Sequence, residues 1–487
     1  MNIETSTLII GAGPAGLTAG VELVRRGNTP LIIESTEKIG GISRTEFIEG
    51  WRFDLGGHRF FTKNERVSKF WQSVLSAEEF PKTSRRSRIY YQKKFFDYPL
   101  KPVNALLNLG LRNTFRAILS YLLVRIRPIK DQSNFETWVA SRFGWYLYRT
   151  FFKTYTEKVW GIEANQIQAD WAAQRIKNLS LSSAIMSAFF PKRFNKGEFT
   201  TLVDEFFYPI YGPGMMWEEC ARIIETSGGK ILFKEKIVGL FRDKIDGVQN
   251  VIQVKCENAK SFSCKNLVSS MALQDLIYLL NPLPPDHVLI AASKLRYRSF
   301  ITVAIPVPGN ATFSDNWIYI HSPEVRVGRI QNYGAWSSHL VKDGWVCLGL
   351  EYFVEENDEL WSMSDAKLIN LAISELETLG LVSMQGVTSG FVVRVAKAYP
   401  VYDSDYRECV ETIKSYLSTH WPNLQTVGRN GLHRYNNQDH SMLTAMYAVD
   451  NLFQTEQKDV WSVNLENEYH ESTSGGGERI APLYPKS

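Results

Sequence analysis

The stretch that decides the fold is Thr7-Leu8-Ile9-Ile10-Gly11-Ala12-Gly13-Pro14-Ala15-Gly16. The apolar run before the first glycine predicts a buried strand, and residues 17–26 have the spacing of a helix. A second apolar run, residues 31–33, ends in Glu34. The order of strand, glycine turn, helix, strand and acid is that of a dinucleotide-binding unit. The sequence therefore predicts an α/β fold with a Rossmann-type domain.

Each glycine of this turn has a physical role in such a unit. Gly11 permits the tight turn, Gly13 lets the backbone approach a pyrophosphate, and Gly16 lets the helix pack closely on the strand. The helix N-terminus then faces the phosphates with unpaired N–H groups and the positive end of its dipole. Glu34 lies where a carboxylate accepts hydrogen bonds from the adenosine ribose. The cofactor-binding residues predicted in this unit are Gly11, Gly13, Pro14, Ala15, Gly16, Glu34 and Ser35.

A second set of glycines follows the acid and indicates which dinucleotide is bound. Gly40-Gly41 comes six residues after Glu34, and Phe53-Asp54-Leu55-Gly56-Gly57-His58 follows soon after. This combination resembles the FAD-binding proteins of the glutathione-reductase type. More narrowly, it resembles the branch that holds amine oxidases, protoporphyrinogen oxidases and UDP-galactopyranose mutases. The resemblance implies FAD rather than NAD, with Gly41, Gly57 and His58 beside it.

The composition limits the organisation of the chain and its partners. With 487 residues the chain is long enough for two domains or more. The net charge of +4 creates no overall field that favours nucleic acid, so we expect none as a partner. Five cysteines without a C-x-x-C pair argue against a disulfide framework and a zinc site, so we expect no metal. No apolar run has the length of a membrane span and no secretory segment precedes Thr7, so we expect a cytoplasmic enzyme.

In the predicted domain plan, segments of the cofactor-binding domain alternate with segments that contact the substrate. It comprises an FAD-binding domain from residues 1–58, 201–271 and 404–465, a helical insertion from 59–200, a mixed-sheet substrate domain from 272–403, and a tail from 466–487. Within the insertion, residues 106–127 are apolar but interrupted by four arginines, which is too much charge to span a bilayer. Two interpretations stay open: a lid helix packed on the core, which we favour, or an amphipathic helix on a membrane surface.

The most informative stretch of the insertion is Tyr155-Thr156-Glu157-Lys158-Val159-Trp160-Gly161, which is followed by Arg175-Ile176. It is similar to a motif of UDP-galactopyranose mutases. In that family the tryptophan lies in the sugar-nucleotide cleft and the arginine reaches the diphosphate, so the resemblance implies these roles for Trp160 and Arg175. The family's second arginine, four residues after the first, is replaced here by Leu179. Lys177 cannot supply the bidentate fork of an arginine, so the exact substrate stays open.

The substrate domain carries further polar candidates. Its antiparallel strands would form the floor of a cleft opposite the flavin. Four side chains would reach into this cleft: Arg329, Asn332, Trp336 and Arg394. Tyr399-Pro400 resembles a tyrosine-proline pair of the mutases, in which the tyrosine hydroxyl binds the substrate phosphate. Tyr402 is the reserve candidate for this role.

The last part of the predicted FAD domain contains a strand at residues 424–427, a Gly428-Arg429 pair, and a helix from His440. The N-terminus of such a helix would face the flavin and stabilise negative charge on the reduced ring. Arg429 can pair with the pyrophosphate as a fork, and Asp439 can cap the helix. The resemblance also implies that the backbone of Val238 contacts the adenine. The cofactor-binding residues predicted in these later segments are Val238, Ser270, Gly428, Arg429, Asp439, Ser441 and Met442.

Two classes of chemistry stay open. The favoured class is a UDP-galactopyranose-mutase-like isomerase, in which N5 of the reduced flavin attacks the anomeric carbon and the phosphate leaves and returns. Arg175, Arg394 and Tyr399 would then serve the phosphate, while His58 and Trp160 would cover the sugar. The second class is an FAD-dependent oxidoreductase of the amine oxidase or protoporphyrinogen oxidase type. The expected substrate is a phosphorylated or nucleotide-linked sugar, and a homodimer stays open.

Overall fold

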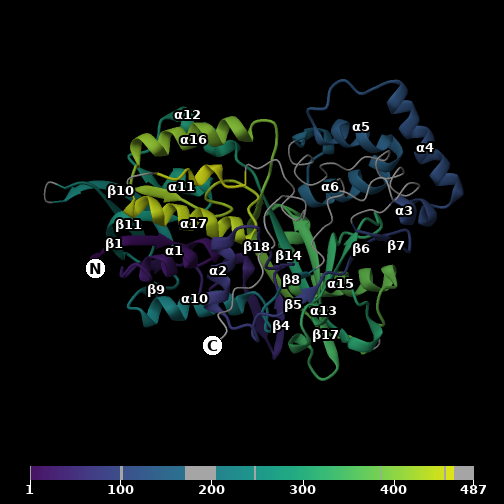
Figure 1. Cartoon of the computed structure of the whole chain (residues 1–487), viewed down its shortest axis with the longest axis horizontal. Helices are drawn as coiled ribbons and strands as arrows, with labels where there is room; N and C mark the ends of the chain where they lie inside the picture. Colours follow the sequence, from purple (N-terminus) through teal and green to yellow (C-terminus); the bar gives the residue numbers. More distant parts are fainter. Residues whose placement is uncertain are drawn as a thin grey trace.

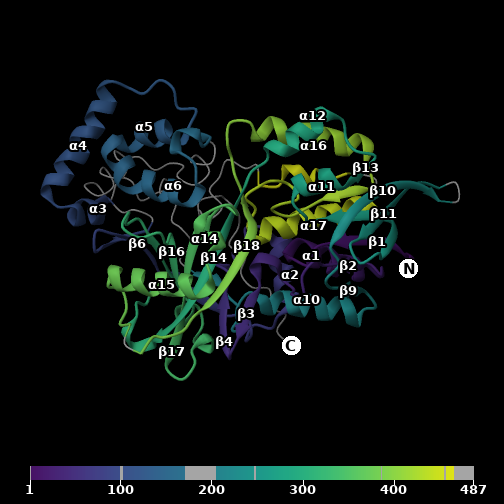
Figure 2. The same cartoon turned by 180° about the vertical axis from the view of Figure 1, so that it is seen from behind.

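The computed structural model describes residues 2–98, 102–169, 205–245, 248–384, 386–454 and 457–464. Two large sheets carry the fold, and a group of helices stands beyond the second sheet (Figure 1). The view from behind shows the same order, with the helices of the first sheet at one side and the separate helical group at the other (Figure 2).

The first sheet has eight strands and is built around β1 (Asn2–Ile10). Leu8 and Ile9 have no exposed surface, as expected for a central strand that is covered on both faces. β1 runs parallel to its two neighbours, β12 and β2. In spatial order the strands are β13 (Leu280–Asn281), β10 (Ile237–Ile245), β11 (Val248–Cys256), β12 (Ser261–Ser269), β1, β2 (Leu31–Ile33) and β9 (Lys230–Leu232), with β19 (Leu424–Thr426) beside β12.

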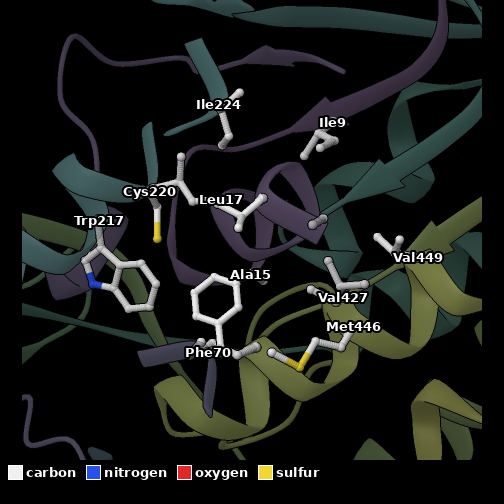
Figure 3. Packing of buried hydrophobic residues seen from close by; sticks show 14 of the residues in the cluster. Ile9, Ala15, Leu17, Phe70, Trp217, Cys220, Ile224, Val427, Met446 and Val449 are labelled. Atoms are coloured by element: carbon white, nitrogen blue, oxygen red, sulfur yellow. The ribbon is translucent and has the colours of Figure 1, made fainter. Parts of the chain in front are cut away.

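Helices cover both faces of this sheet. Those on one face are α1 (Pro14–Val24), α2 (Glu65–Val74), α10 (Gly214–Thr226) and α17 (Gln438–Phe453), and those on the other are α11 (Leu273–Leu279), α12 (Asp286–Lys294) and α16 (Tyr406–His420). Figure 3 shows the first of these two cores, where Leu17 of α1 lies among Ile224 of α10, Val427 and Met446 of α17. Segments that are far apart in the sequence therefore share one core, which fixes α1 and α17 relative to the sheet.

The second sheet has seven strands, and only the pair β15–β6 is parallel. In spatial order they are β18 (Phe391–Pro400), β14 (Tyr297–Pro308), β17 (Trp345–Val354), β16 (Arg329–Asn332), β15 (Trp317–Ile320), β6 (Ser87–Tyr91) and β7 (Lys94–Asp97). α15 (Asp365–Leu379) packs on one face, where Ile301 and Val303 of β14 meet Leu368 and Leu376 of the helix. The opposite face is therefore the one that is free to contribute to a site.

Smaller elements complete the fold. Two short antiparallel pairs are β3 (Thr45–Ile48) with β4 (Trp51–Asp54), and β5 (Lys82–Ser84) with β8 (Glu205–Phe207). Two one-turn helices are α13 (Tyr333–Trp336) and α14 (Glu359–Ser362). The separate helical group contains α3 (Pro102–Leu109), α4 (Leu111–Ile126), α5 (Phe135–Leu147), a π-helical turn at Tyr148–Lys153, and α6 (Thr154–Trp160).

Residues 106–127, which were interpreted above as a lid helix packed on the core, are arranged differently in the structure. They form two helices, α3 and α4, which meet at Gly110 with φ +80°. α4 packs on α5 through Ala117, Tyr121 and Val124, while most of its apolar side chains point away from the protein. None of the helices in the described part of the chain has the length and hydropathy needed to cross a bilayer.

Candidate functional site

A cavity of about 700 Å³ lies at the carboxyl ends of β1, β2 and β12. This edge of a parallel sheet is where α/β proteins bind dinucleotides. Many of the residues predicted to bind a cofactor line it, from three distant parts of the chain. They are Gly11, Gly13, Pro14, Ala15, Glu34, Ser35, Gly41, His58, Ser270, Gly428, Arg429 and Ser441.

The glycine turn has the close contacts that its sequence predicts. Gly11 has φ +95°, and a Cβ atom there would lie 2.3 Å from Oγ of Ser270. A Cβ atom on Gly16 would lie 1.9 Å from the carbonyl oxygen of Gly11, so α1 packs directly on the end of β1. Because the glycines themselves add no side chains to this turn, its backbone offers a surface of the kind that a pyrophosphate needs.

Glu34 is held in place by backbone donors. Its Oε2 accepts a hydrogen bond from the N–H of Ala12, and its Oε1 accepts one from the N–H of Thr36, both at 2.9 Å. Oε1 also accepts from the hydroxyls of Thr36 and Ser35. An ionised carboxylate has about four acceptor positions, so Oε2 keeps capacity for a further donor such as a hydroxyl. The carboxylate is therefore oriented before any ligand arrives.

Five residues predicted to bind the cofactor do not line the cavity. Gly16 lies beneath the turn, and Gly57 lies against Gln331 and Trp336. Met442 is fully buried and accepts a hydrogen bond from Nε1 of Trp71 at 3.0 Å. Val238 is 49% exposed, whereas the two residues before it, Lys236 and Ile237, line the cavity. Asp439 is buried in the first turn of α17.

The helix that points at the far end of the cavity is α17, and its cap differs from the prediction. The N-cap is Asn437, whose side chain accepts from the backbone of His440 while the His440 ring accepts from the N–H of Asn437. The prediction that Asp439 caps this helix is therefore wrong, because the helix begins two residues earlier. Gln438 and Asn436, which the sequence analysis did not select, line the cavity next to it.

Arg429 lies where the cavity meets the second domain. Its Nε donates to the carbonyl oxygen of Asn436 at 2.9 Å and its Nη1 donates to that of Ala398 at 3.1 Å. These bonds fix the guanidinium plane over the rings of Tyr399 and Tyr435, at 5.2 and 5.0 Å from their centres. The two backbone contacts use two of the five N–H donors of the guanidinium, so donors remain for the predicted bidentate grip on a pyrophosphate.

A buried ion pair stands behind the cavity on the open face of the second sheet. Nε of Arg329 donates to Oε1 of Glu351 at 2.9 Å, and Nε2 of Gln331 donates to the same oxygen at 2.8 Å. Glu351 has no exposed surface. Tyr155 and Tyr399 interact electrostatically with both members of the pair. Tyr399 stacks on Tyr435 with 5.5 Å between ring centres.

His58 links this cluster, which consists of Tyr155, Arg329, Glu351, Tyr399 and Tyr435, to the cavity that it lines. Burial lowers the pKa of His58 to about 3, and the positive charges of Arg429 and Arg329 act in the same direction. The imidazole is therefore neutral at physiological pH. Its Nδ1 has no hydrogen-bond partner among the residues that the structure describes.

Arg394, predicted to be catalytic, lies on the other face of the second sheet. Its Nε donates to the carbonyl oxygen of Trp361 at 3.0 Å, and its Nη1 contacts Asp365 at 2.7 Å. Side chains alternate along a strand, and on β18 Val392 packs in the core beneath α15. Arg394 is two residues from Val392 and therefore lies on the same face of β18. The prediction that Arg394 reaches into the cleft is therefore wrong.

Three substrate candidates lie outside the cluster, although two of them contact its member Tyr435. Asn332 lines a separate cavity of about 610 Å³, and its Nδ2 donates to the carbonyl oxygen of Phe313 at 2.6 Å. The hydroxyl of Tyr402 accepts from the N–H of Tyr435 at 2.6 Å. Trp160 is 3% exposed and packs 6.0 Å from the ring of Tyr435.

Arg175 and Lys177 lie outside the described residues. In the part of the chain that is described, no three acidic, histidine or cysteine side chains are arranged to hold a metal.

Tyr155, Glu351 and Tyr435 are the members of the cluster that the sequence analysis did not select as site residues. Tyr155 opens the mutase-like motif, and Tyr435 lies between Arg429 and the last helix, so both were close to recognised signals. Lys158 of the same motif serves the fold, because its ammonium group donates to the carbonyl oxygens of Ser322, Val325 and Val327 at 2.9–3.1 Å. The motif therefore combines a site residue with an anchor for α6.

Asp54, in the turn before His58, makes stability depend on pH. It is 1% exposed and accepts hydrogen bonds from the hydroxyls of Tyr208 and Thr45. Burial raises the pKa of Asp54 from 3.8 to about 7. Between these values the folded protein holds a proton that the unfolded chain releases, so stability falls as pH rises from about 4 to about 7, by up to about 4 kcal/mol. We expect Asp54→Asn to remove this part of the pH dependence in urea unfolding.

The matched control is Asp343→Asn, which changes an exposed carboxyl and should leave the pH profile of the parent protein intact. If Asp54→Asn loses as much stability as the parent between pH 4 and 7, the burial of that carboxyl is not the cause.

The fold and the cavity define a dinucleotide-binding protein of the α/β class, with a Rossmann-like domain joined to a mixed-sheet domain. The family model of an NAD(P)-binding Rossmann-like domain matches residues 9–74. A crystal structure of reduced UDP-galactopyranose mutase has the same fold, with a TM-score of 0.82, 21% identity, and coverage of 94% of this chain and 96% of that one. The predicted fold class is confirmed.

Two curated relatives confirm the resemblance seen in the sequence. A probable UDP-galactopyranose mutase of Klebsiella pneumoniae is 29% identical over 175 residues, which are 33% of this chain and 42% of that protein. A dTDP-fucopyranose mutase of Escherichia coli is 29% identical over 167 residues, which are 33% of this chain and 43% of that protein. The chain therefore spans less than half the length of these curated relatives.

Proposed function

We propose that this protein is an FAD-dependent mutase-type isomerase that acts on a nucleotide-linked sugar. The observation that carries the proposal is the position of the buried cluster of Arg329, Tyr155 and Tyr399 behind the dinucleotide cavity. It combines one oriented cation with phenol hydroxyls, which suits a phosphate. The two curated relatives, a UDP-galactopyranose mutase and a dTDP-fucopyranose mutase, support this choice of substrate class.

The residues that line the cavity fit FAD. The glycine turn leaves its backbone open, and Glu34 has acceptor capacity toward a ribose. The N-terminus of α17 and the neutral His58 stand at the end of the cavity that is nearest the second domain. When bound and reduced, FAD would supply the nucleophilic nitrogen of the isomerisation.

The side chains of the cluster would bind and orient the phosphate that leaves the sugar and returns to it. Glu351 fixes the guanidinium of Arg329, so little rotational freedom is lost on binding. Burial, followed by the neighbouring Tyr435, raises the pKa of Tyr399. Its hydroxyl therefore stays protonated and donates to an anionic oxygen. The uncharged His58 would fill space beside the ring system without repelling the arginines.

Two nucleotide sugars and two flavin states test the proposal. We expect the dithionite-reduced holoprotein to convert UDP-galactopyranose or dTDP-fucopyranose into an isomer, detected by chromatography, with no net change in flavin absorbance. Oxidised protein in air should not consume oxygen with either sugar. Oxygen uptake and flavin bleaching would instead assign the protein to the oxidoreductase class.

Tyr399→Phe sharpens this experiment. Loss of one hydrogen bond to a charged phosphate should lower kcat/KM about 10- to 100-fold. The control is Tyr416→Phe, a tyrosine of α16 that packs in the core of the first sheet, and it should leave kcat/KM unchanged. Equal rates for both variants would remove Tyr399 from phosphate recognition.

A further inference from the structure

The outer face of α4 is apolar and exposed. Leu111 is 92%, Phe115 68% and Ile126 74% exposed, and the neighbouring helix α3 adds Leu107 at 75%. The other exposed apolar side chains of α4 are Ile118, Leu119, Leu122 and Leu123. Both views place α3 and α4 at the periphery of the molecule, on the side away from the first sheet (Figures 1 and 2). A flat partner could therefore touch this face without contacting the Rossmann-like domain.

The exposed residues form a continuous surface because of their spacing. Leu111, Phe115, Ile118, Leu122 and Ile126 follow one another at three or four positions, so they lie on one stripe of the helix. Ala117, Tyr121 and Val124 form the opposite, buried stripe. The inner contact is close, because a Cβ atom on Gly144 of α5 would lie 2.8 Å from the backbone nitrogen of Tyr121. α4 is thus held firmly while its wider apolar face points outward.

Positive charge surrounds this face. No acidic residue occurs between Asp97 and Asp131, whereas the same stretch contains the six cations Lys101, Arg112, Arg116, Arg125, Arg127 and Lys130. At 100° per residue, Arg125 falls on one edge of the apolar stripe and Arg112 and Arg116 fall on the other. Apolar residues flanked by cations are the pattern of a helix that lies in the plane of a bilayer surface.

We propose that α3 and α4 dock this protein on an anionic phospholipid surface, with the apolar stripe in the headgroup region and the arginines against lipid phosphates. Charge favours this partner over a second copy of the chain. Two copies joined through this face would bring two sets of like charges together with no acid in the same stretch to pair them. The proposal concerns peripheral contact only and does not depend on the proposed catalytic activity.

Vesicle sedimentation of the full-length holoprotein tests the proposal. We expect binding to vesicles of equimolar phosphatidylcholine and phosphatidylglycerol, weak binding to phosphatidylcholine alone, and release at high salt because the charges are exposed. Replacing Arg112, Arg116 and Arg125 by Gln should reduce partitioning about a hundredfold, since each contributes about a fivefold effect. Phe115→Glu with Leu122→Glu should abolish it.

The matched control replaces Leu283 and Ile290 by Glu, because these apolar residues are exposed to a similar degree on the Rossmann-like side. This control should bind vesicles like the parent protein. Light scattering of the same variants separates the partners. A shift from dimer to monomer on changing Phe115 and Leu122, with no vesicle binding by the parent, would show that a second copy covers the face and would overturn the proposal. Absence of vesicle binding by the monomeric parent would overturn it as well.

Discussion

Replacing Gly16 by alanine should destabilise the protein by about 3–5 kcal/mol and abolish dinucleotide retention. The added methyl group would lie 1.9 Å from the carbonyl oxygen and 3.0 Å from the carbonyl carbon of Gly11. Both are backbone atoms and cannot rotate away, so α1 would have to move off β1. That movement would open the turn on which the phosphates depend. Urea unfolding and the flavin absorbance of reconstituted protein are the measurements.

Gly27→Ala is the matched control in the loop after the same helix. Gly27 has a positive φ, of +76°, and a Cβ atom there would have no neighbour within 4 Å. Only the backbone conformation is strained, so we expect a loss of about 1 kcal/mol and normal cofactor content. If the two variants behave alike, the close contact between α1 and β1 does not limit the fold.

Glu351→Gln should destabilise the protein by about 3 kcal/mol, because it leaves the guanidinium of Arg329 in the interior without a counter-charge. Glutamine keeps the shape of the side chain, so the loss reports charge rather than a cavity. The variant should also bind a nucleotide sugar more weakly, since Arg329 loses the partner that orients it. Chemical unfolding and equilibrium titration with the sugar measure the two effects.

Glu359→Gln provides the comparison. Glu359 lies 3.4 Å from Arg326, but both side chains are more than half exposed. Exposed pairs contribute little, so the expected change is within about 0.5 kcal/mol. Equal losses in the two variants would mean that the Arg329–Glu351 pair is solvated and does not hold the cluster together.

The residues of the opening glycine turn were predictable because local geometry alone sets their requirements. A positive φ at Gly11 and the close approach at Gly16 involve atoms within a few residues of each other. Glu34 directly follows β2, and its bond to Ala12 spans 22 residues within the same strand–turn–helix–strand unit. These residues line or support the cavity, and their detailed roles toward a cofactor remain predictions.

Predictions that depended on which face of a strand or helix a side chain occupies were less successful. Arg394 is on the helix-covered face of β18, and Asn332 lines a different cavity. One residue of parity decides between the two faces of a strand. Arg329 and Asn332 are three residues apart on β16 and therefore lie on opposite faces, so both could not reach the same cleft. Asp439 was taken as the cap because α17 begins earlier than its apolar spacing suggested.

The sequence alone thus predicted the features that depend on short-range contacts. These are a turn that only glycine can make, an acid at the end of a strand, and the α/β alternation around them. Long-range packing decided the rest. Tyr155 lies on α6, Arg329 and Tyr399 lie on the second sheet, and Tyr435 lies between β19 and α17. Only the packing of these parts against one another brings the four side chains together. Long-range packing also decided which face of α4 points outward. A helix with apolar residues on several sides buries the stripe that its neighbour covers. Here α5 covers the narrower apolar stripe of α4, so the wider one stays exposed.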